Sequence, residues 1–252
     1  MDKFVCKNCG LCCKEESLND DKTEYPRFSP NSYIYYYHKP TLSLFEWEAK
    51  TLQEEAKKQG FNLTIVPYKV IYDQKNKISL VIQYTFKETS CPFFKENKCS
   101  VYNKRALVCQ LFPIQIGSIS DLISGMNEFK ISICPNDMTR EQWADFLGAR
   151  INTKEFVSNM HERYGESYLA LLERDLLLKE SNDWAKYIVD LGLIEPATPD
   201  LKVEKIKNKI EKYPQISLID FMIKHTGLNA LGFIYESNDL KHAKLFVKNL
   251  NK

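Results

Sequence analysis

Apolar residues recur at helical spacing in one stretch of the chain and form β-type runs in the next. Between Thr41 and Lys58 they follow the helical period, and Gly60 stands where a C-terminal cap is expected. From Phe61 to Phe86 the chain is rich in Val, Ile and Tyr, with a polar break at Asp73 to Lys77. The pattern therefore predicts a helix followed by a β-hairpin.

Smaller elements are predicted further along the chain. The turn CPFFKENKC has a cysteine at each end, and a helical turn at Val101 to Val108 follows it. Further strands are predicted between Phe112 and Ile133, around Gly117 and Gly125.

After the last cysteine the helical pattern becomes nearly continuous. One predicted helix carries Trp143 and Phe146, another begins near residues 152–154, and a long one runs from Gly165 to Asp190. The EPATPD stretch around Pro196 is a linker-like break, and two or three shorter helices are expected after it. Together these patterns predict an α+β protein.

We expect two domains. Residues 1–136 would form a small cysteine-rich, metal-binding domain with short strands around a metal site. Residues 137–252 would form a mostly helical domain that binds a protein partner.

Composition excludes several classes of protein. The formal net charge of +2 gives no electrostatic reason to expect nucleic acid or an anionic membrane as a partner. The longest apolar runs are too short to span a bilayer. With only nine glycines, no phosphate-binding glycine loop can be assembled, which counts against P-loop NTPases, Rossmann methyltransferases and dinucleotide-dependent dehydrogenases. We expect a cytoplasmic protein.

All eight cysteines lie in the first 134 residues, four of them in the N-terminal box CKNCGLCC. A disulfide framework would call for an export signal, but MDKFV leads directly into the box. In a reducing cytosol, thiols at ligand spacing favour metal binding over cross-linking. We therefore predict that all eight are metal ligands: Cys6, Cys9, Cys12, Cys13, Cys91, Cys99, Cys109 and Cys134.

Thiolates favour zinc or an iron–sulfur cluster. Cys6, Cys9 and Cys12 match the CxxCxxC part of the bacterial ferredoxin arrangement, in which a fourth cysteine is followed by proline. Both Cys91 and Cys134 precede a proline, so the spacing favours a 4Fe-4S cluster. The radical S-adenosylmethionine box, CxxxCxxC, has the reverse order.

The adjacent residues Cys12 and Cys13 point in different directions, so they fit one tetrahedral metal poorly. Eight cysteines can divide into two four-thiolate sites, or into one site and a set of other thiols. One partition gives Cys6, Cys9, Cys12 and one remote cysteine to the first site. The spacing does not decide which remote cysteine that is.

The runs CKNCGLCC, CPFFKENKCSVYNKRALVCQLFP and ICP together resemble the YkgJ-like cysteine-cluster family over roughly residues 1–136. Its pattern is approximately CxxCGxCC, CPF, CxIYxxRPxxCRxFP and CP. The resemblance implies a zinc- or iron-chelating domain with ligand roles for the eight cysteines. It also implies supporting roles for Tyr102, Arg105 and Pro113. The family includes proteins named as iron–sulfur-containing or as flagellin lysine N-methylases.

Two positions around Cys109 depart from the family pattern. Ala106 stands where the family has proline, and Gln110 stands where it has arginine. An arginine that donates hydrogen bonds to thiolates would be absent, which would alter the charge balance of the site.

No other residues form a motif that indicates a particular reaction. The four histidines are scattered and are expected to be surface or packing residues. The tyrosines from Tyr33 to Tyr37 are expected to pack beside a core helix. Three functions stay open: a metal-binding protein with a redox or partner-binding role, a cluster-dependent enzyme such as a protein-lysine N-methylase, and a structural zinc module in an interaction protein.

Overall fold

The computed structural model describes most of the chain outside residues 14–24, 115–152 and 228–239. The described residues are 3–5, 10, 13, 25–29, 32–38, 40, 42–88, 90–114, 153–199, 201–227 and 240–250. The predicted strands around Gly117 and Gly125, and the predicted helix with Trp143 and Phe146, lie outside them.

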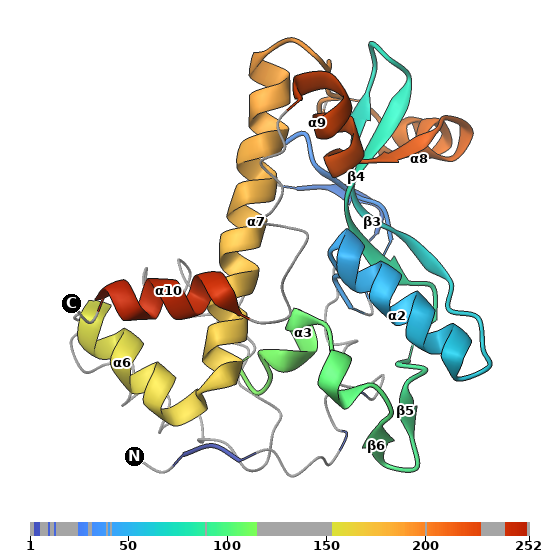
Figure 1. Ribbon diagram of the computed structural model, residues 1–252. Coiled ribbons are helices and arrows are strands. Elements are labelled where there is room, and N and C mark those ends of the chain that lie inside the picture. Colours follow the sequence, from blue (N-terminus) through green and yellow to red (C-terminus); the bar gives the residue numbers. More distant parts are fainter. Residues whose placement is uncertain are drawn as a thin grey trace. The chain divides into compact units, whose positions relative to one another are not determined.

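The described strands form one mixed sheet and one small hairpin (Figure 1). The sheet has the order β1-β2-β3-β4-β7, antiparallel except for the parallel pair β4–β7. Its strands are β1 Arg27–Phe28, β2 Tyr35–Tyr36, β3 Ile65–Asp73, β4 Ile78–Phe86 and β7 Gln215–Ser217, and the hairpin pairs β5 Phe94–Lys95 with β6 Lys98–Cys99.

The described helices lie mostly in the second half of the chain, which with the sheet confirms the predicted α+β class. None of them is long and apolar enough to cross a membrane. They are α2 Glu46–Lys58, the 3-10 turn η2 Tyr102–Lys104, α3 Leu107–Gln110, α6 Thr153–Tyr164, α7 Glu166–Asp190, α8 Val203–Lys212, α9 Leu218–Thr226 and α10 Lys241–Leu250.

The β3–β4 hairpin has the predicted polar break between its strands. The Asp73 carboxylate accepts the backbone N–H of Lys75 at 3.0 Å, and Lys77 takes a positive φ of 54° at the end of the turn. Asp73 also accepts the N–H of Glu195 at 3.0 Å, so one buried carboxylate orders both the turn and the segment after α7.

Helix α2 begins at Glu46, later than the sequence pattern predicts. Leu44 exchanges two backbone hydrogen bonds of 2.8 Å with Tyr84 of β4, which keeps the preceding residues extended. The Glu48 carboxylate then accepts the N–H of Phe45 at 2.7 Å and so closes the first turn of the helix. Tertiary pairing with the sheet therefore sets where the helix starts.

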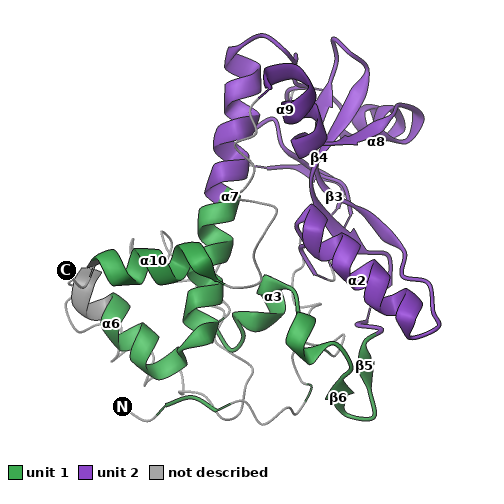
Figure 2. Ribbon diagram, viewed as in Figure 1, with its two compact units in different colours: residues 1–18, 93–178, 237–252 green, residues 19–92, 179–236 purple. Residues whose placement is uncertain are grey.

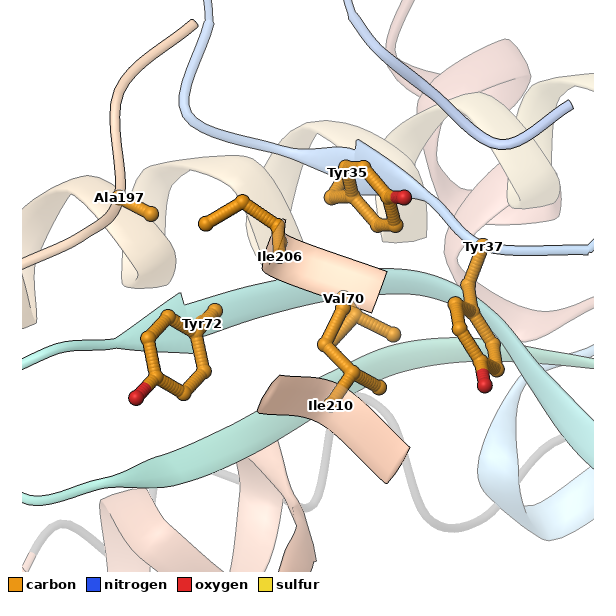
Figure 3. Packing of buried hydrophobic residues seen from close by; sticks show 7 residues of the cluster. All are labelled: Tyr35, Tyr37, Val70, Tyr72, Ala197, Ile206 and Ile210. Carbon is orange, nitrogen blue, oxygen red and sulfur yellow. The ribbon is translucent and has the colours of Figure 1, made fainter. Parts of the chain in front are cut away.

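Two tyrosines of the YIYYY run, Tyr35 and Tyr37, pack in a core, as predicted. Tyr35 of β2 lies opposite Val70 of β3, and both side chains are fully buried against Ile206 and Ile210 of α8 (Figure 3). Full burial of an aliphatic side chain of this size contributes about 1.5–3 kcal/mol. These residues account for the placement of α8 on this face of the sheet.

The predicted break around Pro196 is part of this core. Ala197 is buried in it, and its N–H donates to the carbonyl oxygen of Tyr72 at 2.9 Å. Helix α7 ends at Asp190 as predicted, before this break, and the segment of the break pairs with the sheet at the end of β3.

The chain divides into two compact units (Figure 2). Unit 1 comprises residues 1–18, 93–178 and 237–252, and unit 2 comprises residues 19–92 and 179–236. Unit 2 holds the sheet, and unit 1 holds the β5–β6 hairpin with α3, α6 and α10. The predicted domain boundary at residues 136 and 137 lies outside the described residues and stays a prediction.

Candidate metal centre

Four of the eight predicted ligands are among the described residues. Cys13, Cys91, Cys99 and Cys109 are all partly buried, and none of them forms a disulfide. The other four, Cys6, Cys9, Cys12 and Cys134, lie outside the described residues. Cys13, Cys99 and Cys109 belong to unit 1, while Cys91 stands two residues before the unit's second segment begins.

Cys99 lies on one face of the β5–β6 hairpin. It pairs directly with Phe94, and Lys95 pairs with Lys98. Phe94 and Cys99 are partly buried, whereas the two lysines are exposed. Because side chains alternate along a strand, Phe94 and Cys99 share the inner face of the hairpin and the lysines share the outer one.

A two-residue turn makes this hairpin possible. Glu96 and Asn97 both have positive φ values, 50° and 60°. This is the backbone pattern of the turn that best matches the twist of two paired strands. The turn therefore places Cys99 directly opposite Phe94.

The N-terminal box contacts this same face. A Cβ atom added to Gly10 would lie 1.9 Å from Cζ of Phe94, so the ring occupies the space of a side chain at that position. Gly10 also has a φ of +71°, which side chains disfavour. Its carbonyl oxygen accepts the N–H of Cys13 at 2.9 Å, which makes a tight turn inside the box.

The chain just before the box is attached to the end of α6. The N–H of Phe4 donates to the carbonyl oxygen of Arg163 at 2.9 Å, and the Phe4 ring lies 6.0 Å from that of Tyr164. The described contacts of this part of the chain are therefore those of Phe4, before the box, and of Gly10, inside it.

Cys109 lies on the short helix α3, whose first residue, Leu107, is fully buried. The N–H of Cys109 donates to the carbonyl oxygen of Ala106 at 2.9 Å. Gln110, which stands where the family pattern has arginine, donates its side-chain N–H to the carbonyl oxygen of Arg105 at 2.6 Å. This hydrogen bond stabilises the backbone at the start of α3.

The motif positions between Cys99 and Cys109 contact each other. The guanidinium carbon of Arg105 lies 3.7 Å above the ring of Tyr102, and its Nε donates to the Tyr102 carbonyl oxygen at 3.0 Å. After Cys109, the hydroxyl of Ser167 at the start of α7 donates to the carbonyl oxygen of Phe112 at 3.0 Å. The peptide bond from Phe112 to Pro113 is cis.

The sequence around these cysteines is basic, although Lys95 and Lys98 lie on the outer face of the hairpin, away from Cys99. The segment from Cys91 to Gln110 carries four basic residues against one acidic residue, Glu96. Bound thiolates bring negative charge to a metal, and nearby cations offset it. The four described cysteines are partly buried and outside disulfides, and such donors fit zinc or an iron–sulfur cluster.

Within the described part of the chain, no group of three His, Cys, Asp or Glu side chains converges to hold a metal ion. The described geometry instead brings together two parts of the predicted ligand set, the box at Gly10 and the hairpin at Cys99. Sequence reasoning did not identify Phe94, Phe4 or Ser167 as parts of this scaffold. The isolated glycine of the box was the available signal, because a glycine between ligands suggests close approach of another group.

Three of the described histidines take surface or packing positions, as the sequence predicts. Nδ1 of His242 lies 2.6 Å from the buried carboxylate of Glu173, which also accepts the N–H of Ala243 at 2.8 Å. His225 stacks on Phe221, and burial lowers the pKa of His38.

Residues 5–136 match the family CxxCxxCC, described as "Putative zinc- or iron-chelating domain". No match was found among curated proteins or among solved structures. The matched range covers just over half of the 252 residues and includes all eight cysteines. The chain therefore belongs to the CxxCxxCC zinc- or iron-chelating family.

Proposed function

We propose that this protein binds a metal centre through the thiolates of its eight cysteines and uses that centre in a redox or partner-binding role in the cytoplasm. The observation that carries the proposal is the packing of Gly10 on Phe94, which brings this glycine of the cysteine box to the face of the hairpin that carries Cys99. Packing between segments that are distant in the sequence suits a site whose ligands come from both.

An iron–sulfur cluster of the 4Fe-4S type is the favoured centre. Its support is the CxxCxxC spacing of the box together with two downstream Cys-Pro pairs. Zinc is the alternative, because four thiolates also satisfy its tetrahedral preference. A protein partner that binds the helical half stays a prediction.

Anaerobic purification followed by metal and sulfide analysis tests the proposal. An iron–sulfur centre predicts a brown protein with sulfide equimolar to iron and a broad thiolate-to-iron absorption band. A zinc centre predicts a colourless protein with zinc and no sulfide. A preparation with neither metal, under conditions that keep its thiols reduced, would rule the proposed function out.

Serine substitutions supply the matched controls. Cys99→Ser keeps the size of the side chain but removes a soft thiolate, and it should lower the bound metal. Ser100→Ala, at the next position along the chain, should leave the metal content unchanged. Equal metal contents in the two variants would exclude Cys99 as a ligand.

A further inference from the structure

The sheet of unit 2 carries basic and aromatic side chains side by side on one of its faces. We propose that this face binds single-stranded nucleic acid, whose phosphates contact the two cations and whose bases stack on the rings and on the guanidinium. We call it the tyrosine–cation face, and its residues are Tyr25, Arg27, Tyr36, Tyr68 and Lys69. The proposal goes beyond the metal-binding function and involves none of the cysteines.

Strand register places three of these residues in one row. Arg27 of β1 pairs with Tyr36 of β2, which pairs in turn with Lys69 of β3. Directly paired residues project from the same face of a sheet. The next row, which includes Tyr35 and Val70, projects from the opposite face and packs against α8 (Figure 3). The row at Tyr36 therefore lies on the face of the sheet opposite to α8.

Rings and cations of this face meet around Tyr36. The guanidinium carbon of Arg27 lies 4.8 Å from the centre of the Tyr36 ring, and the ammonium of Lys69 lies 5.5 Å from it. The ring centres of Tyr25 and Tyr68 lie 6.4 and 5.4 Å from that of Tyr36. At these distances the cations are attracted to the faces of the rings, so the contacts hold three rings and two cations together.

Arg27 has donors that these ring contacts leave unused. Its guanidinium carbon also lies 5.4 Å from the centre of the Tyr25 ring, and its Nε is buried with no hydrogen-bond partner among the described residues. A stacked guanidinium still carries N–H donors along its planar edge, and that edge matches the oxygens of a phosphate. We therefore expect Arg27 to bind a phosphate while it remains stacked on Tyr36.

Single-stranded nucleic acid fits this face better than other anions do. A free phosphate or an acidic protein segment would use the cations but not the rings, whereas unpaired bases stack on aromatic rings and on guanidinium planes. Arg27 and Lys69 lie on strands two spacings apart, about 10 Å, so they can contact different phosphates of one strand. All five residues are partly exposed. The net charge of the whole chain gives no reason to expect nucleic acid, so the inference depends on this local arrangement.

Binding of a fluorescent oligo(dT) of about ten nucleotides to the whole chain, measured by anisotropy at low salt, tests the proposal. Arg27→Gln and Lys69→Gln should each weaken binding. Each should also reduce the slope of log affinity against log salt concentration by about 0.7, the value for one phosphate contact with a single strand. No binding by the wild type, or unchanged slopes in both variants, would overturn the proposal.

Two lysines of α8 supply matched controls. Lys209 and Lys212 also lie over tyrosine rings, 5.2 Å from the centre of Tyr72 and 5.6 Å from that of Tyr213, but outside the tyrosine–cation face. Lys209→Gln and Lys212→Gln should leave the affinity and the salt slope nearly unchanged. Losses as large as those of Arg27→Gln would show that binding is spread over the basic surface of the protein, and would contradict the assigned face.

Ring substitutions separate base stacking from simple attraction between charges. Tyr36→Leu should weaken binding about 5-fold to 100-fold, the effect of losing one stacked base, whereas Tyr36→Phe keeps the ring and should bind like the wild type. Circular dichroism checks the fold, and Tyr25→Leu, outside the strands, provides a second ring deletion. Full affinity in the folded ring variants, with both cation variants weakened, would show a site for anions such as acidic protein segments, and the nucleic-acid proposal would be wrong.

The result is independent of the metal centre. Each of these variants should keep the metal content of the wild type, because none of them changes a cysteine. A metal-loaded wild-type protein that binds no oligonucleotide would defeat this inference and leave the proposed function intact. Conversely, a protein without metal that binds the oligonucleotide with the expected dependence on Tyr36 would support this inference and defeat the proposed function.

Discussion

The two hairpins of this protein differ in what can hold them together. The β3–β4 hairpin of unit 2 pairs strands of nine residues each, and both of its faces are largely buried. The β5–β6 hairpin of unit 1 pairs strands of two residues, with its lysines exposed on one face. Backbone pairing and apolar burial suffice for the first, but a hairpin as short as the second is marginal in water on its own.

This difference indicates which interactions stabilise each region. In unit 2 the fully buried Tyr35, Val70 and Ile206 supply a core that needs no other link. Around Cys99 the neighbouring Phe93, Val101 and Leu107 are buried, but the paired strands are short, and segments distant in the sequence meet there, as Gly10 does on the Phe94 ring. Metal–thiolate bonds would add strong cross-links to this region.

Metal removal is the sharpest way to test the comparison. A chelator that strips the metal should loosen the β5–β6 hairpin and the box but leave the β3–β4 hairpin ordered, because thiolate–metal bonds contribute about 10 kcal/mol in small structural sites. Hydrogen exchange resolved by segment measures this. We expect faster exchange at residues 93–110 and little change at residues 65–86.

The matched control for metal removal is the same chelator applied after saturating free metal has been added. Protection at residues 93–110 should then persist. If chelation left both hairpins equally protected, the short hairpin would be held by ordinary packing, and the contrast between the regions would disappear.

A truncation in the core of unit 2 should lower stability without removing metal. Ile206→Ala removes a fully buried side chain from the unit 2 core and should lower the free energy of unfolding by about 2–5 kcal/mol. Metal content should be unchanged. Ile223→Ala is the matched control, because Ile223 is 44% exposed and its truncation should cost far less. Urea denaturation of the two variants measures the difference, and similar costs would contradict the assigned core.

The long elements could be predicted from the sequence because their order is local. Richness in Val, Ile and Tyr around a polar break predicted the β3–β4 hairpin, and helical periodicity predicted a long helix from Gly165 to Asp190, where α7 spans Glu166–Asp190. Strand β7 was missed because its three residues, Gln215–Ser217, are ordered by pairing with β4, more than 130 residues earlier in the chain. A three-residue run carries too little periodicity to be recognised.

The candidate site could likewise be predicted only where the signal is local in the sequence. Ligand spacing marked the cysteines as candidate ligands, because metal binding by thiolates depends on short-range patterns such as CxxC. The contact between Gly10 and Phe94 could not be predicted, because nothing near either residue specifies a partner far along the chain. The grouping of ligands therefore depends on tertiary structure.

Alkaline pH should weaken unit 2 through its tyrosines. Burial, which is the larger cause, and the hydrogen bond to Glu211 together raise the pKa of Tyr37 to about 12. The unfolded chain loses this proton near its ordinary pKa of about 10, so stability is complete below pH 10 and falls as the pH rises toward 12. Burial also raises the pKa of Tyr35, which adds to the fall.

Tyr37→Phe tests this dependence. At pH 8 the variant should lose about 1 kcal/mol, the net contribution of one hydrogen bond. Between pH 8 and pH 11 its urea midpoint should fall less than that of the wild type, because one titrating group is gone. The same slope in both proteins would show that Tyr37 ionises equally in the folded and unfolded states.

The smallest expected effect is a stabilisation of unit 1 that leaves its cysteines untouched. Ala106 has a φ of −59°, and the preceding Arg105 has a ψ of 144°, so both conformations already suit a proline at position 106. Ala106→Pro should therefore raise the free energy of unfolding by about 0.5 kcal/mol, by restricting the unfolded chain. Gln110→Pro is the control, because its N–H donates to the Ala106 carbonyl oxygen at 3.0 Å, and it should destabilise α3. If Ala106→Pro lowered the free energy of unfolding as much as Gln110→Pro does, the buried position 106 could not accommodate the proline ring. Close packing would then matter around Cys109 as much as it does in the sheet.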